Sequence, residues 1–579
     1  MPLFVIGLSG MKIYETMAGA VPGPYKNCTN VHISSVPMLL LLSFLTLFVC
    51  INGSPTIELG ETTLMGLDIP TFQQEFFGGI PFAEPPLESL RLKPPIPMAL
   101  SSLGSATFNA TSFGPACLQF DLPLDVTSED CLTMNVLRPA GTPANAKLPV
   151  MFWTYGGGFF SGASSTFNAS VIVAQSVARG TPLIYVNFNY RLGPLGFPQG
   201  QEAENLGALN LALKDQIAAL QWVQSNIGTF GGDPDKVTVF GESAGAIMTS
   251  ILFLNSPIAN LARAAIFESG SQATVALFTP ERREVDWENF VGNVASCASL
   301  ATSGNTFSCL QNASTTEIFE GILASIAEAT EEFPWDPVID GPGGLIPDLP
   351  SVLFRRRQFA RLPFMAGTNL DEGTLFTPTT INSTQEIQES FVTMSSPSIS
   401  LATLQESVLA LLQLYPDIPA LGSPFNTGND TFGLSPQYKR AAAIGTDLDF
   451  LSQRRLWIET AANAGVPTFA YLFTQPQPEL SPALGVEHGS EILFVYGAPN
   501  DTAPSSIALS RIMTDYWVSF ATSLTPNDGL GVPRPEWTQF TPKNQAVIQL
   551  NGVNLTMIPD DFRAEQTNFI NSNPVIWHH

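Results

Sequence analysis

The stretch Val237-Thr238-Val239-Phe240-Gly241-Glu242-Ser243-Ala244-Gly245 places one serine between two glycines directly after a β-rich run. This Gly-x-Ser-x-Gly pattern is typical of a nucleophile held on a sharp turn from a strand to a helix. The two glycines permit the tight bend and the close approach of the helix, which leaves the serine exposed in a strained conformation. We therefore expect Ser243 to be a nucleophile, although the pattern alone also fits an ordinary glycine-rich turn.

Strand-like runs alternate with helical periodicity on both sides of this turn. Between residues 205 and 227, for example, apolar residues recur at spacings of three and four, as they do along one face of a helix. Such alternation predicts an α/β fold with a mostly parallel central sheet flanked by helices. The strand-like runs are 148–154, 183–188, 237–240, 362–366 and 468–473.

Residues 54–579 are expected to form a single catalytic domain, because no linker, internal repeat or low-complexity tract interrupts them. The part from about 280 to 415 is richer in Ser, Thr and Glu and looks more helical than stranded. We expect it to be a helical insertion over the sheet.

The chain is strongly acidic, with a net charge of -25 from 50 acidic and 25 basic residues among 579. Contacts with phosphate groups need clustered Lys and Arg, so this balance argues against a nucleic-acid or anionic-membrane partner. An acidic, well-solvated surface is the simple interpretation, and the sequence indicates no particular oligomeric state.

Residues 1–53 are expected to be an N-terminal extension with a secretory signal segment. Leu39–Val49 is almost wholly apolar and is followed by small or polar residues, as in a signal peptide. The 16 residues from Val36 to Ile51 fall short of the about 20 that a spanning helix needs, so we expect secretion without a stable membrane span. An uncleaved anchor is the alternative. Because residues 1–37 precede the apolar core, Met38 is a candidate for the true start.

Four of the six cysteines follow the signal segment, and an even number suits disulfides in a secreted protein. Of the three connectivities, the short spacings favour Cys117 with Cys131 and Cys297 with Cys309, and reduced, buried cysteines are the alternative. We expect no metal, because no Cys-x-x-Cys pair occurs and histidines are scarce. A secreted glycoprotein would carry glycans at several of the Asn-x-Ser/Thr sequences at Asn109, Asn168, Asn312, Asn382, Asn429, Asn500 and Asn554.

A serine nucleophile needs a general base, which is usually histidine, and a carboxylate that orients the base. The chain has only four histidines: His32 lies before the signal core, and His578 and His579 form the extreme C-terminus. His488 is therefore the expected base. Without Ser243, it would fit an ordinary histidine of a surface loop.

Several ordered motifs between Gly78 and Trp537 resemble those of the type-B carboxylesterase, lipase and cholinesterase family, which has the α/β-hydrolase fold. The resemblance implies that the acid of the triad lies in an Asp-Glu-Gly motif, matched here by Asp371-Glu372-Gly373, so that Glu372 completes the order Ser243, Glu372, His488. The matching motifs are Gly79-Ile80-Pro81-Phe82-Ala83-Glu84-Pro85-Pro86, Ser128-Glu129-Asp130-Cys131-Leu132-Thr133-Met134-Asn135-Val136, Asn189-Tyr190-Arg191-Leu192-Gly193, Phe230-Gly231-Gly232-Asp233-Pro234 and the Ser243 turn.

A glycine run, Tyr155-Gly156-Gly157-Gly158-Phe159, follows the strand-like run 148–154 and precedes the nucleophile. Backbone N–H groups that point at the carbonyl oxygen of an ester stabilise the charge of the transition state. By family resemblance, Gly157, Gly158 and Ala244 donate these groups, and Glu242 stands near the histidine. A flexible turn and a surface or structural salt bridge are the simpler interpretations of the glycine run and of Glu242.

These features predict a secreted serine hydrolase that cleaves carboxylic esters through an acyl-enzyme, without a metal or organic cofactor. In lipases of the resembling family, the loop closed by the first disulfide is a long mobile flap, whereas Cys117 and Cys131 enclose only 13 residues. We therefore prefer a carboxylesterase over an interfacial triacylglycerol or sterol-ester lipase. A non-catalytic adhesion or binding protein on the same scaffold is a more distant alternative.

Overall fold

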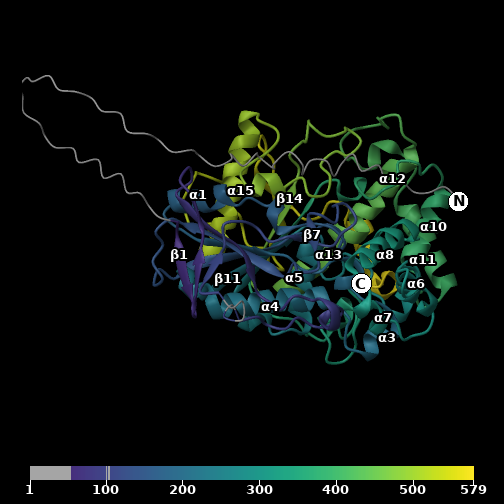
Figure 1. Cartoon of the computed structure of the whole chain (residues 1–579). Helices are drawn as coiled ribbons and strands as arrows, with labels where there is room; N and C mark the ends of the chain where they lie inside the picture. The colour runs from purple at the N-terminus through teal and green to yellow at the C-terminus, as the bar shows by residue number, and fades with distance from the viewer. Residues whose placement is uncertain (1–53, 100, 102–104) are drawn as a thin grey trace, which may run out of the picture.

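The computed structural model describes residues 54–99, 101 and 105–579 (Figure 1). An eleven-stranded mixed sheet forms its centre, in the order β16-β15-β14-β13-β12-β11-β9-β10-β8-β4-β3. The strands from β10 to β15 in this order pair in parallel, and antiparallel strands flank them on both sides. The strands are β3 (Leu67–Ile69), β4 (Gln74–Pro81), β8 (Thr133–Pro139), β9 (Leu148–Thr154), β10 (Ile184–Phe188), β11 (Gly232–Glu242), β12 (Ala264–Glu268), β13 (Phe364–Asn369), β14 (Thr468–Phe473), β15 (Ala546–Leu550) and β16 (Thr556–Pro559).

Four of the central strands are short, mostly apolar runs whose residues are buried along their whole length. Every residue of β10, β12, β13 and β14 is buried. Parallel strands covered on both faces need such continuous apolar runs, which is why no alternation of polar and apolar residues marks them. Two small sheets lie outside the central one, formed by β1 (Thr56–Leu59), β2 (Thr62–Met65) and β5 (Thr107–Asn109), and by β6 (Ala116–Cys117) and β7 (Thr127–Ser128).

Helices flank the sheet, and α6, α8, α10 and α11 gather at one end of the molecule (Figure 1). Helices α10, α11, α12 and α16 share a second apolar core, which includes Ile387, Leu404 and Val408. The helices are α1 (Ser170–Ala178), α2 (Gly193–Gly196), α3 (Gly200–Asn205), α4 (Leu211–Asn226), α5 (Ala244–Asn255), α6 (Glu284–Gly292), α7 (Phe307–Asn312), α8 (Thr315–Glu328), α9 (Pro350–Arg355), α10 (Thr384–Met394), α11 (Leu401–Leu414), α12 (Pro436–Gly445), α13 (Ser452–Asn463), α14 (Ile492–Val495), α15 (Pro504–Ser523) and α16 (Ala564–Ser572), with a π-helical turn, η11 (Thr446–Leu451), between α12 and α13.

The helix expected over 205–227 begins later than its apolar spacing indicates. Helix α4 starts at Leu211, because Gly207 and Asn210 have left-handed φ angles of 66° and 54° that a helix cannot contain. The predicted start at residue 205 is wrong, because apolar periodicity does not reveal single residues with left-handed backbone angles.

Both disulfides join the pairs that short spacing favours. The Cys117–Cys131 bond has an S–S distance of 2.02 Å, and the Cys297–Cys309 bond has one of 1.99 Å. Residues 1–53 lie outside the described part of the chain. They include the expected signal segment, the candidate start at Met38, and Cys28 and Cys50. Among the described helices, none is long and apolar enough to cross a bilayer.

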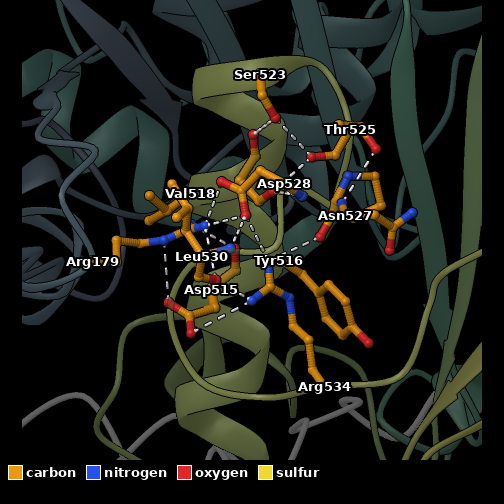
Figure 2. A network of polar contacts seen from close by, with 12 residues as sticks. Arg179, Asp515, Tyr516, Val518, Ser523, Thr525, Asn527, Asp528, Leu530 and Arg534 are labelled. Carbon is orange, nitrogen blue, oxygen red and sulfur yellow. Dashed lines mark hydrogen bonds and ion pairs between the residues drawn. The ribbon is translucent and has the colours of Figure 1, made fainter.

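A compact ionic network, here called the Arg179 cluster, ties α1 to α15 and the segment after it (Figure 2). It consists of Arg179, Asp515, Asp528 and Arg534, whose side chains are all at least nine-tenths buried. Arg179 Nη2 lies 2.5 Å from Asp528 Oδ2, and Arg534 Nη2 lies 3.1 Å from Asp528 Oδ1. Two guanidinium groups thus face two carboxylates.

Candidate active site

Ser243 occupies the turn between β11, which ends at Glu242, and α5, which begins at Ala244. Its φ of 54° and ψ of -130° are rarely adopted by residues other than glycine, so its backbone is strained. A Cβ added to Gly245 would lie 2.0 Å from the carbonyl oxygen of Thr154, and one added to Gly241 would lie 2.7 Å from the same atom. Both glycines of the motif are therefore needed for the end of β9 to pack against the turn.

His488 and Glu372 come together although 116 residues separate them in the chain. The Nδ1 atom of His488 lies 2.6 Å from Oε2 of Glu372, which is the contact expected between a base and its orienting acid. Glu372 is fully buried, and its Oε1 accepts a 2.6 Å hydrogen bond from the backbone N–H of Asn369. The carboxylate is thus fixed at both oxygens.

The other nitrogen of His488 faces Glu242. Nε2 lies 3.2 Å from Oε1 of Glu242, and neither atom has a hydrogen-bond partner in the described residues. Within the same residues, no hydrogen bond joins Ser243 to His488. Catalytic hydrogen bonds are often long in structures without substrate and tighten when it binds, so this arrangement is compatible with a base that turns to the serine.

The proton affinities of His488 and Glu242 are coupled by this contact. Burial opposes the charged imidazole, but the carboxylates of Glu242, Glu372 and Glu491 outweigh burial and raise the pKa of His488 from 6.5 to about 9. Burial raises the pKa of Glu242 to about 8, and the nearby imidazole opposes that increase. Both groups therefore hold their protons more tightly than the free side chains do.

Two further buried carboxylates, Glu268 and Glu491, lie beside the predicted triad and were not expected from the sequence. Ser269 Oγ and Asn369 Nδ2 donate to Glu491 at 3.0 and 2.6 Å, and Trp517 Nε1 donates to Glu268 at 2.6 Å. Burial raises the pKa of both acids. The backbone N–H of Ser243 donates to the Glu268 carbonyl at 3.0 Å, so Glu268 also supports the turn that carries Ser243.

A register argument could have found Glu268. Strands β11 and β12 are parallel neighbours, and Glu242 pairs directly with Glu268 at their carboxyl ends. Glutamates that end adjacent parallel strands meet at the same edge of the sheet, where ligand sites of α/β folds lie. However, which strands are neighbours in the sheet depends on the tertiary fold, and the sequence motifs do not specify it.

The glycine run after β9 lies against the turn that carries Ser243. A Cβ on Gly156 would be 2.8 Å from the Cβ of Ser243. Gly157 and Gly158 have left-handed φ angles of 101° and 61°. In the described residues, none of the N–H groups of Gly157, Gly158 and Ala244 donates a hydrogen bond, so all three remain available as donors to a substrate oxygen.

Aromatic side chains of the helical part surround the histidine and the glycine run. The rings of Phe376 and Phe450 lie 5.0 and 4.9 Å from the imidazole. Phe333 lies so close to Gly158 that an added Cβ there would be 2.9 Å from its Cε1 atom, and it also packs near Phe160. The expected insertion therefore contributes an apolar wall to the site.

The loop closed by Cys117 and Cys131 is anchored to this site. Gln119 exchanges two hydrogen bonds with the backbone of Gly162, of 2.8 and 3.1 Å, and β6 pairs with β7 across the loop. Glu129 near its end forms a buried ion pair with Arg91 at 2.6 Å. These contacts tie both ends of the short loop to the rest of the fold. In the described residues, no cluster of His, Cys, Asp and Glu could hold a metal ion.

Comparisons with known proteins agree with this architecture. The sequence model of the carboxylesterase family matches residues 54–570. Lipase 2 of Geotrichum candidum is 34% identical over 84% of this chain and 90% of its own, and Secreted lipase 1 of Botryotinia fuckeliana is 34% identical over 90% and 93%. The crystal structure of Aspergillus niger EstA matches the fold with a TM-score of 0.77 at 24% identity, covering 91% of this chain and 99% of that one. The chain therefore belongs to the carboxylesterase family, has its α/β-hydrolase fold and is a carboxylic ester hydrolase.

Proposed function

We propose that this protein is an extracellular carboxylesterase that uses Ser243 as nucleophile, His488 as general base and Glu372 as the acid that orients the base. The 2.6 Å contact between His488 Nδ1 and Glu372 Oε2 carries this proposal, together with the strained backbone of Ser243. The N–H groups of Gly157, Gly158 and Ala244 would hold the oxyanion.

The proposed cycle has two acyl-transfer steps. Ser243 Oγ attacks the ester carbonyl while its proton passes to Nε2 of His488, and the alcohol then leaves with that proton. Water, deprotonated by the same nitrogen, next attacks the acyl-enzyme and releases the carboxylic acid and the free serine. The imidazole must therefore turn Nε2 from Glu242 toward Ser243, while Glu372 keeps its hold on Nδ1.

An extracellular location is supported by the two disulfides and by a relative named as a secreted lipase. The apolar segment Leu39–Val49 is the proposed signal, with Met38 as the proposed start. Mass spectrometry of the mature N-terminus tests both. Recovery of a peptide from residues 1–37 in secreted material would contradict the proposed start.

The anchored loop between Cys117 and Cys131 favours an esterase that acts on soluble or moderately apolar esters. An interfacial lipase is the second candidate, because two of the similar proteins are named lipases. Titrating a partly soluble ester through its solubility limit separates them. We expect saturation below the limit; a sharp rate increase once droplets form would assign a lipase.

A panel of p-nitrophenyl, aryl, triglyceride and sterol esters tests the reaction itself. The wild type should hydrolyse several of them, and Ser243→Ala should hydrolyse none above background while retaining the wild-type melting temperature. Equal activity of the two proteins would contradict the assigned nucleophile. Inactivity of a folded wild type toward every ester would favour a binding protein on the same scaffold.

A further inference from the structure

A second hollow, here called the C-terminal groove, lies between the end of α11, η10 (Pro419–Leu421) and α12 on one side and β14, β15, β16 and α16 on the other. Its volume is about 710 Å³. Small-molecule sites typically measure about 300–1,000 Å³, so the groove has the size of a ligand site. Ser243, Glu372 and His488 are not among its lining residues. Its apolar lining includes Leu414, Leu421, Phe425, Leu472, Ile558 and Phe562.

Arg563 presents an unused guanidinium edge in this groove. Its Nε donates to the buried Asp447 at 2.7 Å, and its Cζ lies 4.1 Å from the ring centroid of Phe425 and 5.4 Å from that of Phe562. In the described residues, its two terminal nitrogens have no hydrogen-bond acceptor, and its side chain is 16% exposed. The ring contacts and Asp447 hold the guanidinium plane, while its outer edge remains available.

The other charged groups in or beside the groove already have hydrogen-bond partners. Arg440 donates from Nε to the Tyr415 carbonyl and from Nη2 to the Leu412 carbonyl, the latter at 2.8 Å. Asp447 is fully buried and bonds Arg563 Nε on one oxygen and the Tyr415 hydroxyl on the other, at 2.8 Å. Arg563 is therefore the charged group at the groove that has unused hydrogen-bond donors. The chain as a whole has a net charge of -25.

We propose that the C-terminal groove binds a long-chain carboxylate, with its head on Arg563 and its chain along the apolar lining. A guanidinium fork matches a carboxylate with two parallel hydrogen bonds, and apolar walls favour an aliphatic chain. A long-chain acid is a product class of carboxylic ester hydrolysis, so this choice of ligand rests on the proposed function.

Oleate titration by calorimetry, below the concentration at which oleate forms micelles, tests the proposal. Ser243 is first blocked with a long-chain alkyl fluorophosphonate, so that the catalytic site is filled. The protein is also deglycosylated, because Asn554 of an Asn-x-Thr sequence lines the groove. We expect one oleate per chain and at least about tenfold weaker binding by Arg563→Gln. The absence of saturable binding by the blocked wild type would overturn the proposal.

A matched pair at Leu421 keeps the test valid if loss of Arg563 harms folding by leaving Asp447 unpaired. Leu421 is 58% exposed, so substitution there spares the core. Leu421→Glu should weaken oleate binding about tenfold through charge repulsion, whereas Leu421→Gln should change it by about twofold or less. Equal binding by the two variants, or equal binding of oleate and the neutral oleyl alcohol by the wild type, would overturn the proposal. Fluorophosphonate labelling reports the proposed function separately.

Discussion

Two buried charged clusters of this protein differ in how their charges are balanced. The Arg179 cluster pairs two guanidinium groups with two carboxylates (Figure 2). The cluster around His488 places one imidazole among several buried glutamates, including those at positions 242, 268, 372 and 491. Balanced charges fix the surrounding elements in place. Burial, assisted by neighbouring acids, raises the pKa of Glu242 to about 8, and the carboxylates raise that of His488 to about 9 against the effect of burial. Shifted pKa values of this kind are typical of sites that carry out acid–base chemistry.

This difference predicts that substitutions in the His488 cluster change activity, whereas substitutions in the Arg179 cluster change stability. A buried charge that loses its partner destabilises the fold, because it stays desolvated without compensation. The His488 cluster already contains more acids than its cation can compensate. Loss of one of its carboxylates should therefore cost less folding free energy than loss of an aspartate from the Arg179 cluster.

The largest expected effect is that of Glu372→Gln. The amide keeps the size of the side chain but cannot stabilise the imidazolium or hold its tautomer as the carboxylate does. We expect kcat to fall by about 10⁴-fold. Steady-state kinetics with a soluble p-nitrophenyl ester, together with a melting curve, measures both quantities. An active Glu372→Gln enzyme would mean that another group orients His488.

Asp515→Asn should have the second-largest effect, and on stability alone. It leaves Arg179 and Arg534 buried with one carboxylate between them, which should cost about 3–5 kcal/mol of unfolding free energy. Urea unfolding measures this loss, and active-site titration corrects kcat for the folded fraction. A stable variant with reduced kcat would contradict the separation between the two clusters.

Glu242→Gln should shift the pH dependence. The wild-type pKa of His488 is raised above 6.5 in part by Glu242, so the acid limb of kcat/KM should have its midpoint above that value. The amide removes a negative charge, which destabilises the imidazolium and lowers its pKa. Activity should therefore persist to lower pH. An unchanged or higher midpoint would show that Glu242 does not act on His488.

Arg356→Ala should have the smallest effect and is the exposed counterpart of Asp515→Asn. Arg356 pairs with Asp348 at 3.0 Å, but its side chain is 58% exposed. Solvent screens such pairs, so we expect a loss below about 1 kcal/mol. A larger loss, measured by the same urea titration, would mean that burial does not explain the stability of the Arg179 cluster.

Local sequence signals predicted the scaffold of the site well. The strands at 148–154 and 468–473 agree with β9 and β14 to the residue, because apolar runs report burial in a parallel sheet. Strand β11, in contrast, extends back to Gly232, with a register shift between Gly232 and Val237. Its early residues are polar and include Pro234, so local propensity does not indicate a strand there.

The features that the sequence did not predict depend on long-range packing. Glu268 and Glu491 reach the site because β11 pairs with β12 and because the His488 loop lies beside β13. The open edge of Arg563 likewise exists only because Asp447 and Phe425, distant in the chain, hold the guanidinium. Sequence motifs identify residues by their local context, whereas contacts between residues distant in the chain depend on the tertiary fold.

The most direct test of the account is to map the residue that a fluorophosphonate probe modifies. Peptide mass spectrometry of the labelled wild-type protein should place one equivalent of probe on Ser243. The Ser243→Ala protein, folded by its melting curve, should remain unlabelled. A label on a different residue, or full labelling of Ser243→Ala, would contradict the assignment of Ser243 as the nucleophile.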